Sequence, residues 1–259
     1  MKKVKIGLNN LYLFPNEKAE YILIDTGLKC DEEKIVLGLE KEIGSIDKIK
    51  VIVITHSHDD HIGNLKMLTE KIKNQDLTVI LHIGAKNTVL YGEKNIPGGF
   101  YKITRFISRK IKEKALKEVD RDKGNQGKKQ EYGKERLLAN DIRNIVFLDF
   151  EKYDEYSLEK YGFSNLKIIY TPGHTMDSIS LVYESSENKA KYLFCGDMVQ
   201  NLLWKKPLVP LFGDDIDKLM ESWEKISSEK YDRIYPATGK YVITEDLGKV
   251  LEKYEKNRV

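Results

Sequence analysis

The chain has 259 residues, of which 41% are hydrophobic and 33% are charged. This balance excludes an intrinsically disordered chain, and the length suffices for a hydrophobic core without support from disulfides or a metal. The net charge is +3, from 44 basic and 41 acidic residues, so overall charge does not favour wholesale binding of nucleic acid or of a membrane surface. Two cysteines, Cys30 and Cys195, form no disulfide framework and are typical of a reducing compartment.

Neither a targeting segment nor a membrane span is expected. The basic start, Met1-Lys2-Lys3, resembles the first part of a signal peptide, but Asn9 and Pro15 interrupt the apolar stretch that should follow. Nowhere does an apolar run approach the roughly 18 residues of a membrane helix. We therefore predict a cytoplasmic protein.

Strand and helix patterns alternate in the first third of the chain. Short runs rich in β-branched residues predict strands, and apolar residues at helical spacing predict helices. Such alternation indicates α/β layering. In chain order we expect strands at 4–8, 11–14 and 21–25, a helix at 31–43, a strand at 49–54, a polar turn at 55–61, a helix at 62–73 and a strand at 77–83.

Residues 84–143 break this rhythm, and we interpret them as a helical, Lys-rich insertion within a single domain of residues 1–259. Residues 100–119 have helical periodicity, and residues 122–133 have the composition of a loop. Between positions 102 and 129 there are eleven basic and four acidic residues. The stretch could be a lid that recruits an anionic substrate or a surface that binds nucleic acid. A solvated helix with Phe100, Ile103 and Phe106 turned inward is favoured.

Strands return in the second half of the chain. Asp214 is expected to cap a helix that runs to about residue 228, and Thr244 to open a terminal helix. The expected strands are 145–150, 166–170, 179–183, 192–195 and 233–235.

A dense cluster of titratable residues follows the apolar strand 49–54. Three of the five histidines, His56, His58 and His61, fall within six residues, together with Asp59 and Asp60. Imidazole and carboxylate are common ligands of zinc and similar metals. Unpaired beside a hydrophobic core, these groups would be costly. The cluster therefore predicts a metal site.

The pattern His-x-His-x-Asp-His resembles the motif of the metallo-β-lactamase superfamily of metal-dependent hydrolases. Four further segments resemble that family in the expected order, and the resemblance covers roughly residues 4–83 and 145–250. It implies a four-layer αββα sandwich, of mixed α+β or α/β class, with the site at one edge. The four segments are Asp25-Thr26-Gly27, Thr171-Pro172-Gly173-His174-Thr175, Cys195-Gly196-Asp197 and Tyr235-Pro236-Ala237-Thr238-Gly239-Lys240.

The resemblance also implies a role for each matching residue. Three of these residues would bind a first metal ion, two would bind a second, and one would bridge the two ions. Asp25 would help to orient the site. The implied ligands are His56, His58 and His174 for the first metal, Asp60 and His61 for the second, and Asp197 as the bridge.

One position departs from the family pattern. The last histidine of the family is replaced by Thr238, and Ala237 stands in place of a glycine. A hydroxyl is a poor ligand compared with imidazole. We therefore expect one firmly bound Zn²⁺ and a second site that is weaker or empty, with Fe or Mn as possible alternatives. The remaining histidine, His82, is expected to have a structural role.

These features predict a metal-dependent hydrolase that uses a metal-activated water on a small-molecule ester, thioester, lactone or related bond. Asp60 would be the catalytic base if the second site is empty, and a ligand if it is filled; the sequence leaves both open. The alternatives are a nuclease or phosphodiesterase of the same superfamily that uses the basic insertion, and a non-catalytic metal-binding protein with a degraded second site.

The segment 198–212 follows Asp197 and is rich in apolar residues, including Trp204, Leu208 and Phe212. It could form the apolar wall of a substrate pocket, or it could be a packed loop. Cys195 is expected to be a small strand residue and not a nucleophile. The substrate and the oligomeric state are not defined by the sequence.

Overall fold

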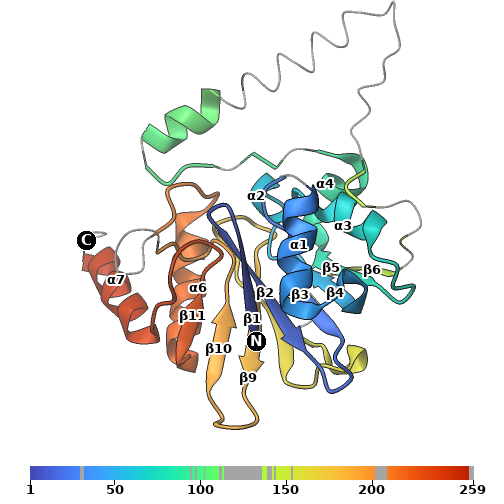
Figure 1. Ribbon diagram of the computed structural model, residues 1–259. Coiled ribbons are helices and arrows are strands. Elements are labelled where there is room, and N and C mark those ends of the chain that lie inside the picture. Colours follow the sequence, from blue (N-terminus) through green and yellow to red (C-terminus); the bar gives the residue numbers. More distant parts are fainter. Residues whose placement is uncertain are drawn as a thin grey trace, which may run out of the picture.

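Two β-sheets pack face to face, and helices cover their outer faces (Figure 1). The computed structural model describes residues 1–29, 32–93, 95–96, 98–101, 103–110, 113, 136–138, 142, 144–152, 154–201 and 209–256. One sheet has the strand order β1-β2-β3-β4-β5-β6, and the other has the order β11-β10-β9-β8-β7.

The first sheet mixes antiparallel and parallel pairs. Strands β1, β2 and β3 are antiparallel, whereas β3, β4, β5 and β6 run parallel. Helices α1, α3 and α4 cover its outer face (Figure 1). Its elements are β1 (Lys2–Ile6), β2 (Asn9–Pro15), β3 (Tyr21–Ile24), α1 (Glu32–Ile43), η1 (Ile46–Lys48), β4 (Ile49–Val53), α2 (Asp59–Ile62), α3 (Leu65–Lys71), β5 (Thr78–His82), η2 (Ile83–Ala85), α4 (Lys86–Tyr91) and β6 (Asn144–Leu148).

The second sheet is antiparallel except for the parallel pair β10 and β11. Helices α6 and α7 cover its outer face (Figure 1). Its elements are β7 (Glu155–Ser157), η3 (Glu159–Tyr161), β8 (Leu166–Tyr170), β9 (Ile179–Glu184), β10 (Lys191–Phe194), α6 (Ile216–Glu229), β11 (Arg233–Tyr235) and α7 (Thr244–Lys256).

Three apolar clusters separate the four layers. Neighbouring residues of a strand point to opposite faces, so Val51 and Val53 of β4 pack between the sheets while Ile52 packs beneath the helices. In β8, Ile168 faces the first sheet and Ile169 faces α6 and α7. Both sheets are therefore buried on both faces, and the expected αββα sandwich is confirmed.

The histidine motif begins where β4 ends. The backbone joins this segment to both sheets: Ile54 N donates to Ile80 O at 3.0 Å, and Ile179 N donates to Thr55 O at 2.8 Å. The carboxyl ends of parallel strands meet at one edge of a sheet, where side chains from separate loops can converge. In the second sheet, β8 and β10 are both antiparallel to β9 and so run in the same direction as each other. The segments that follow β4, β8 and β10 carry the sequence motifs.

Several details differ from the sequence predictions. The helix expected at 62–73 is two helices, α2 and α3, and α2 already begins at Asp59, within the expected polar turn. The side chain that caps α6 is Asp215, which accepts from the backbone N–H groups of Asp217 and Lys218, and not Asp214. Helix α4 and strand β7 were not expected.

The apolar face predicted for the insertion helix is wrong. Residues 103–110 are helical, but Ile103 is 69% exposed and Phe106 is 53% exposed, whereas Thr104 and Ser108 are buried. Of the three side chains expected to face inward, only Phe100 packs against the apolar cluster beneath α6. The expected loop at 122–133 lies outside the described residues, and no helix within the described part is long and apolar enough to cross a membrane.

Candidate metal centre

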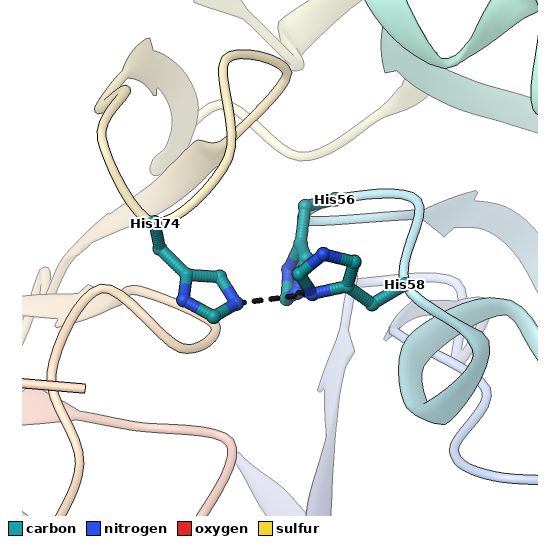
Figure 2. Close-up of side chains that lie close together, drawn as sticks. All are labelled: His56, His58 and His174. Atoms are coloured by element: carbon teal, nitrogen blue, oxygen red, sulfur yellow. Dashed lines mark hydrogen bonds between the residues drawn. The ribbon is translucent and has the colours of Figure 1, made fainter. Parts of the chain in front are cut away.

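Three buried histidines from two loops form the centre of the site. His56 and His58 belong to the loop after β4, and His174 belongs to the loop after β8 (Figure 2). Gly173 has φ +130°, and a Cβ there would overlap the backbone of Leu219 in α6. Only glycine fits this close approach, so the loop can bring His174 to the other two rings.

The distances between these rings are those of a ligand set. His58 Nδ1 lies 3.1 Å from His56 Nε2 and 3.1 Å from His174 Nε2. Two nitrogens bound to one tetrahedral zinc at the usual bond length are about 3.3 Å apart. The three nitrogens therefore already stand near the positions that one metal ion requires.

Hydrogen bonds on the far side of two rings fix where their protons lie. His174 Nδ1 donates to the carbonyl oxygen of Phe212 at 3.0 Å. The Thr55 hydroxyl donates to the Asp25 carboxylate, so its oxygen can accept from His56 Nδ1 at 3.2 Å. In a neutral ring the other nitrogen is then unprotonated. The Nε2 lone pairs of His56 and His174 therefore face His58 and are available to a cation.

The electrostatics of the three rings favour the ligand form. Burial, reinforced by the neighbouring imidazoles, holds the pKa of His56 and of His58 well below its usual value. Burial also lowers the pKa of His174. Neutral imidazole is the form that binds metals, so these histidines need no deprotonation at neutral pH.

His61 and two carboxylates form a second group beside the first. His61 Nδ1 donates to Asp25 Oδ2 at 2.8 Å, and His61 Nε2 lies 3.6 Å from both Asp60 Oδ2 and Asp197 Oδ1. This Nε2 is buried and has no hydrogen-bond partner among the described residues. Burial would lower the pKa of His61, but Asp25 and Asp197 outweigh it and hold the pKa well above its usual value. Carboxylates that stabilise a proton here would also stabilise a metal ion.

The donors thus fit a metal in two overlapping groups. His56, His58 and His174 form one, and His56, His61 and Asp197 form the other, with the ligand atoms of each group within 4.8 Å of one another. Asp60 lies near the second group but at the surface of the site, where its side chain is 43% exposed.

Thr238 lies beside Asp197 of the second group. Its Oγ1 donates to Asp197 Oδ1 at 3.1 Å, and the Gln200 amide donates to Asp197 Oδ2 at 3.2 Å. Burial would raise the pKa of Asp197, but the neighbouring His61 and His174 and the hydrogen bond from Thr238 hold it well below its usual value. Asp197 is therefore an ionised carboxylate whose two oxygens are both engaged.

Replacing Thr238 by histidine is expected to increase the number of firmly bound metal ions from about one to about two, because imidazole is a far better ligand than a hydroxyl. Isothermal titration calorimetry of the metal-free protein with Zn²⁺ measures the number of bound ions. Thr238→Val, which removes only the hydroxyl, is the matched control and should keep the original stoichiometry. An unchanged stoichiometry in Thr238→His would contradict the assignment of this position.

Replacing Asp25 by asparagine is expected to lower the metal affinity of the group that contains His61 about 10- to 100-fold. This is the usual cost of losing the partner that orients a metal-binding histidine. Asp25 has φ +59°, a conformation that asparagine also tolerates, so the backbone should not be disturbed. Competition with a chromophoric chelator gives the affinity. Wild-type affinity in Asp25→Asn would mean that this carboxylate does not orient His61.

The other residues expected at the site have mixed placements. Phe212 lies beside the histidines in the wall of a cavity of about 260 Å³, whereas Trp204 and Leu208 lie outside the described residues. The ring of His82 stacks on Tyr170 and Phe150, and His82 belongs to neither ligand group. Cys195 is buried, and burial raises the pKa of its thiol.

Four polar residues of the site were missed by the sequence analysis. Thr55 directly precedes the motif, which is a signal that could have indicated it. The backbone N–H of Ser57 donates to Asp177 at 3.0 Å, so this buried carboxylate helps to hold the histidine loop. Asn95 and Gln200 line the cavity, and no spacing in the sequence marks either one.

The sandwich fold places two groups of buried histidine and aspartate side chains, which fit a divalent metal ion, at one edge of the sheets. The family model of the metallo-beta-lactamase superfamily matches residues 6–238. The chain therefore belongs to the metallo-β-lactamase superfamily, as the motifs predicted.

Curated proteins with similar sequences support the family assignment. The chain is 28% identical over 247 residues to the beta-lactamase-like protein 2 homolog of Caenorhabditis elegans, a match that covers 95% of this chain and 59% of that protein. This chain thus spans about three fifths of the length of that curated relative. Over 78 residues it is 38% identical to a hydroxyacylglutathione hydrolase of Francisella philomiragia, covering 30% of this chain and 29% of that protein.

Among solved structures, a metallo-beta-lactamase superfamily protein from the archaeon Sulfolobus tokodaii shares the fold. The TM-score is 0.60 at 22% identity, and the alignment covers 97% of this chain and 84% of that one. The described elements therefore follow the family architecture over almost the whole chain.

Proposed function

We propose that this protein is a metal-dependent hydrolase of small-molecule esters, thioesters or lactones. The observation that carries the proposal is the convergence of three buried, neutral histidine nitrogens within 3.1 Å of their neighbours. The likeness to a hydroxyacylglutathione hydrolase, whose name describes a thioester substrate, supports an acyl compound as the target. Zn²⁺ is the proposed metal, because imidazole-rich sites with few carboxylates favour it.

A bound divalent cation would lower the pKa of a coordinated water and polarise the carbonyl that is attacked. His56, His58 and His174 would hold the first ion, and His61 with Asp197 would offer a weaker second place. Asp60 stands at the open side of the site, with its carboxylate free to accept the proton that the attacking water loses. It can then return this proton to the leaving group. Phe212 supplies an apolar wall against which an acyl chain can pack.

The proposal is tested with chromogenic substrates. Purified protein loaded with Zn²⁺ is assayed on p-nitrophenyl acetate, on an acetyl thioester detected by thiol release, and on bis-p-nitrophenyl phosphate. We expect turnover of the acyl substrates that a chelator abolishes and Zn²⁺ restores. Preferred turnover of the phosphodiester would favour the nuclease alternative instead, and complete inactivity of the metal-loaded protein would favour a non-catalytic metal-binding protein.

A further inference from the structure

One segment of the insertion lies beside the loop that precedes α6. Residues 98–101 stand between α4 and the helical residues 103–110, and Figure 1 shows this part of the chain reaching the side of the molecule where α6 lies. The loop before α6, residues 209–215, contains Phe212, whose carbonyl oxygen accepts from His174 Nδ1 at 3.0 Å. The insertion can therefore act on a metal ligand through this loop.

Backbone hydrogen bonds join the insertion segment to the loop. Gly213 N donates to Gly98 O at 3.3 Å, and Phe100 N donates to Leu211 O at 3.4 Å. Gly98 N in turn donates to the Asp214 carboxylate at 3.2 Å. These distances lie at or beyond the upper end of the usual N–H···O range. The bonds therefore align the two segments but hold them weakly.

The aromatic ring of Phe100 makes the firmer contact. It lies so close to the backbone of Gly213 that a Cβ there would overlap the ring. The φ angle of Gly213 is outside the left-handed region, so it is the ring, and not the backbone conformation, that requires glycine at this position. The same ring packs against the apolar cluster that includes Leu219 and Trp223 of α6. Phe100 thus fills the space between this cluster and the loop.

The residues on either side of Gly213 hold His174. Asp214 N donates to the backbone oxygen of His174 at 3.0 Å, and Phe212 O accepts from the His174 ring. Gly213 joins these two contacts in the chain, so a displacement of Gly213 would move both of them. The orientation of the His174 imidazole therefore depends on what fixes Gly213.

We propose that Phe100 is a positioning residue for the metal centre: its ring braces Gly213, and the neighbouring Phe212 carbonyl then holds the His174 imidazole in its metal-binding orientation. The inference rests on the metal site of the proposed function and gives the insertion a role in it. His174 is the ligand of the first group that lies outside the loop after β4. Its position consequently depends on contacts between distant segments, of which this is one.

The test is the Zn²⁺ affinity of the folded protein, measured by competition with a chromophoric chelator. Phe100→Ala is expected to bind Zn²⁺ about tenfold more weakly, the lower end of the range for residues that orient a ligand. Tyr254→Ala is the matched control. The Tyr254 ring, on α7, packs against the same apolar cluster, and its hydroxyl donates to Asp217 of α6. Both variants should lose thermal stability, but Tyr254→Ala should keep the wild-type Zn²⁺ affinity.

A second variant tests the contact between the ring and the loop. Gly213→Ala sets a methyl group against the Phe100 ring, so it should weaken Zn²⁺ binding in the wild-type background and have little effect in Phe100→Ala. Residues in contact show such non-additive effects. In NMR spectra of the Zn²⁺-loaded protein, the His174 Nδ1–H signal should exchange faster with water in Phe100→Ala, because its bond to Phe212 O is loosened, and be unchanged in Tyr254→Ala.

Each result decides between the alternatives. Wild-type Zn²⁺ affinity in a folded Phe100→Ala variant would overturn the inference, as would an equal loss of affinity in Tyr254→Ala. Unchanged affinity in Gly213→Ala would overturn it as well, even if Phe100→Ala does not fold. Failure of the wild-type protein to bind Zn²⁺ would refute the proposed function together with the inference. Affinity that depends on Phe100, in a protein that hydrolyses none of the acyl substrates, would refute the proposed function alone.

Discussion

Replacing Asp60 by asparagine is expected to lower kcat about 10²- to 10⁴-fold, the usual contribution of a positioned general base. Asparagine has almost the same shape but neither accepts a proton nor carries a charge. The Asp60 carboxylate stands 3.6 Å from His61 Nε2 and is 43% exposed, so it can meet both the site and a substrate. Steady-state kinetics on the best acyl substrate measures the effect.

The neighbouring residue is a matched control for this variant. Asp59 lines the same cavity but is exposed, and Asp59→Asn should stay within a few-fold of the wild type. Metal content separates the two roles of Asp60: a base leaves the bound metal unchanged, whereas a ligand of a second ion does not. An Asp60→Asn enzyme with wild-type kcat would eliminate both roles.

Replacing His174 by alanine is expected to abolish both metal binding and hydrolysis. Loss of a residue that only orients a ligand costs about 10- to 100-fold in affinity, and loss of a ligand itself should exceed that. His174 brings the only ligand nitrogen of the first group that lies outside the loop after β4. Elemental analysis after dialysis, together with the ester assay, measures both effects.

His82→Gln is the control for this variant. The His82 ring lies nearly parallel to the rings of Tyr170 and Phe150, with a centroid distance of 4.9 Å to Tyr170. It belongs to neither ligand group, so the variant should retain metal and activity. Full metal content in His174→Ala, or loss of metal in His82→Gln, would mean that the ligand set is assigned incorrectly.

The parts of this molecule that the sequence predicts are those with a dense local signal. Val51, Ile52 and Val53 form a β-branched run that must be buried on both faces, and His56 and His58 follow it within a few residues. His174 and Asp197 follow strands of the other, largely antiparallel sheet, and their place at the site could be predicted because their segments resemble motifs of the family.

The parts that the sequence does not predict depend on contacts between distant segments. Asn95 and Asp177 meet across 82 residues, and neither stands in a recognisable pattern. Ile103 and Phe106 have helical spacing, yet periodicity does not say which face of a short helix finds a core. Asp214 and Asp215 are equivalent as capping residues in the sequence, and only the backbone shows that Asp215 is the cap.

We expect this chain to hold one divalent metal ion firmly between His56, His58 and His174. The most direct test is the elemental metal content per chain, by mass spectrometry, of protein purified without a metal-affinity column. We expect about one equivalent of a divalent metal, with Zn²⁺ the main species. A value near zero, with no uptake when Zn²⁺ is added, would contradict it.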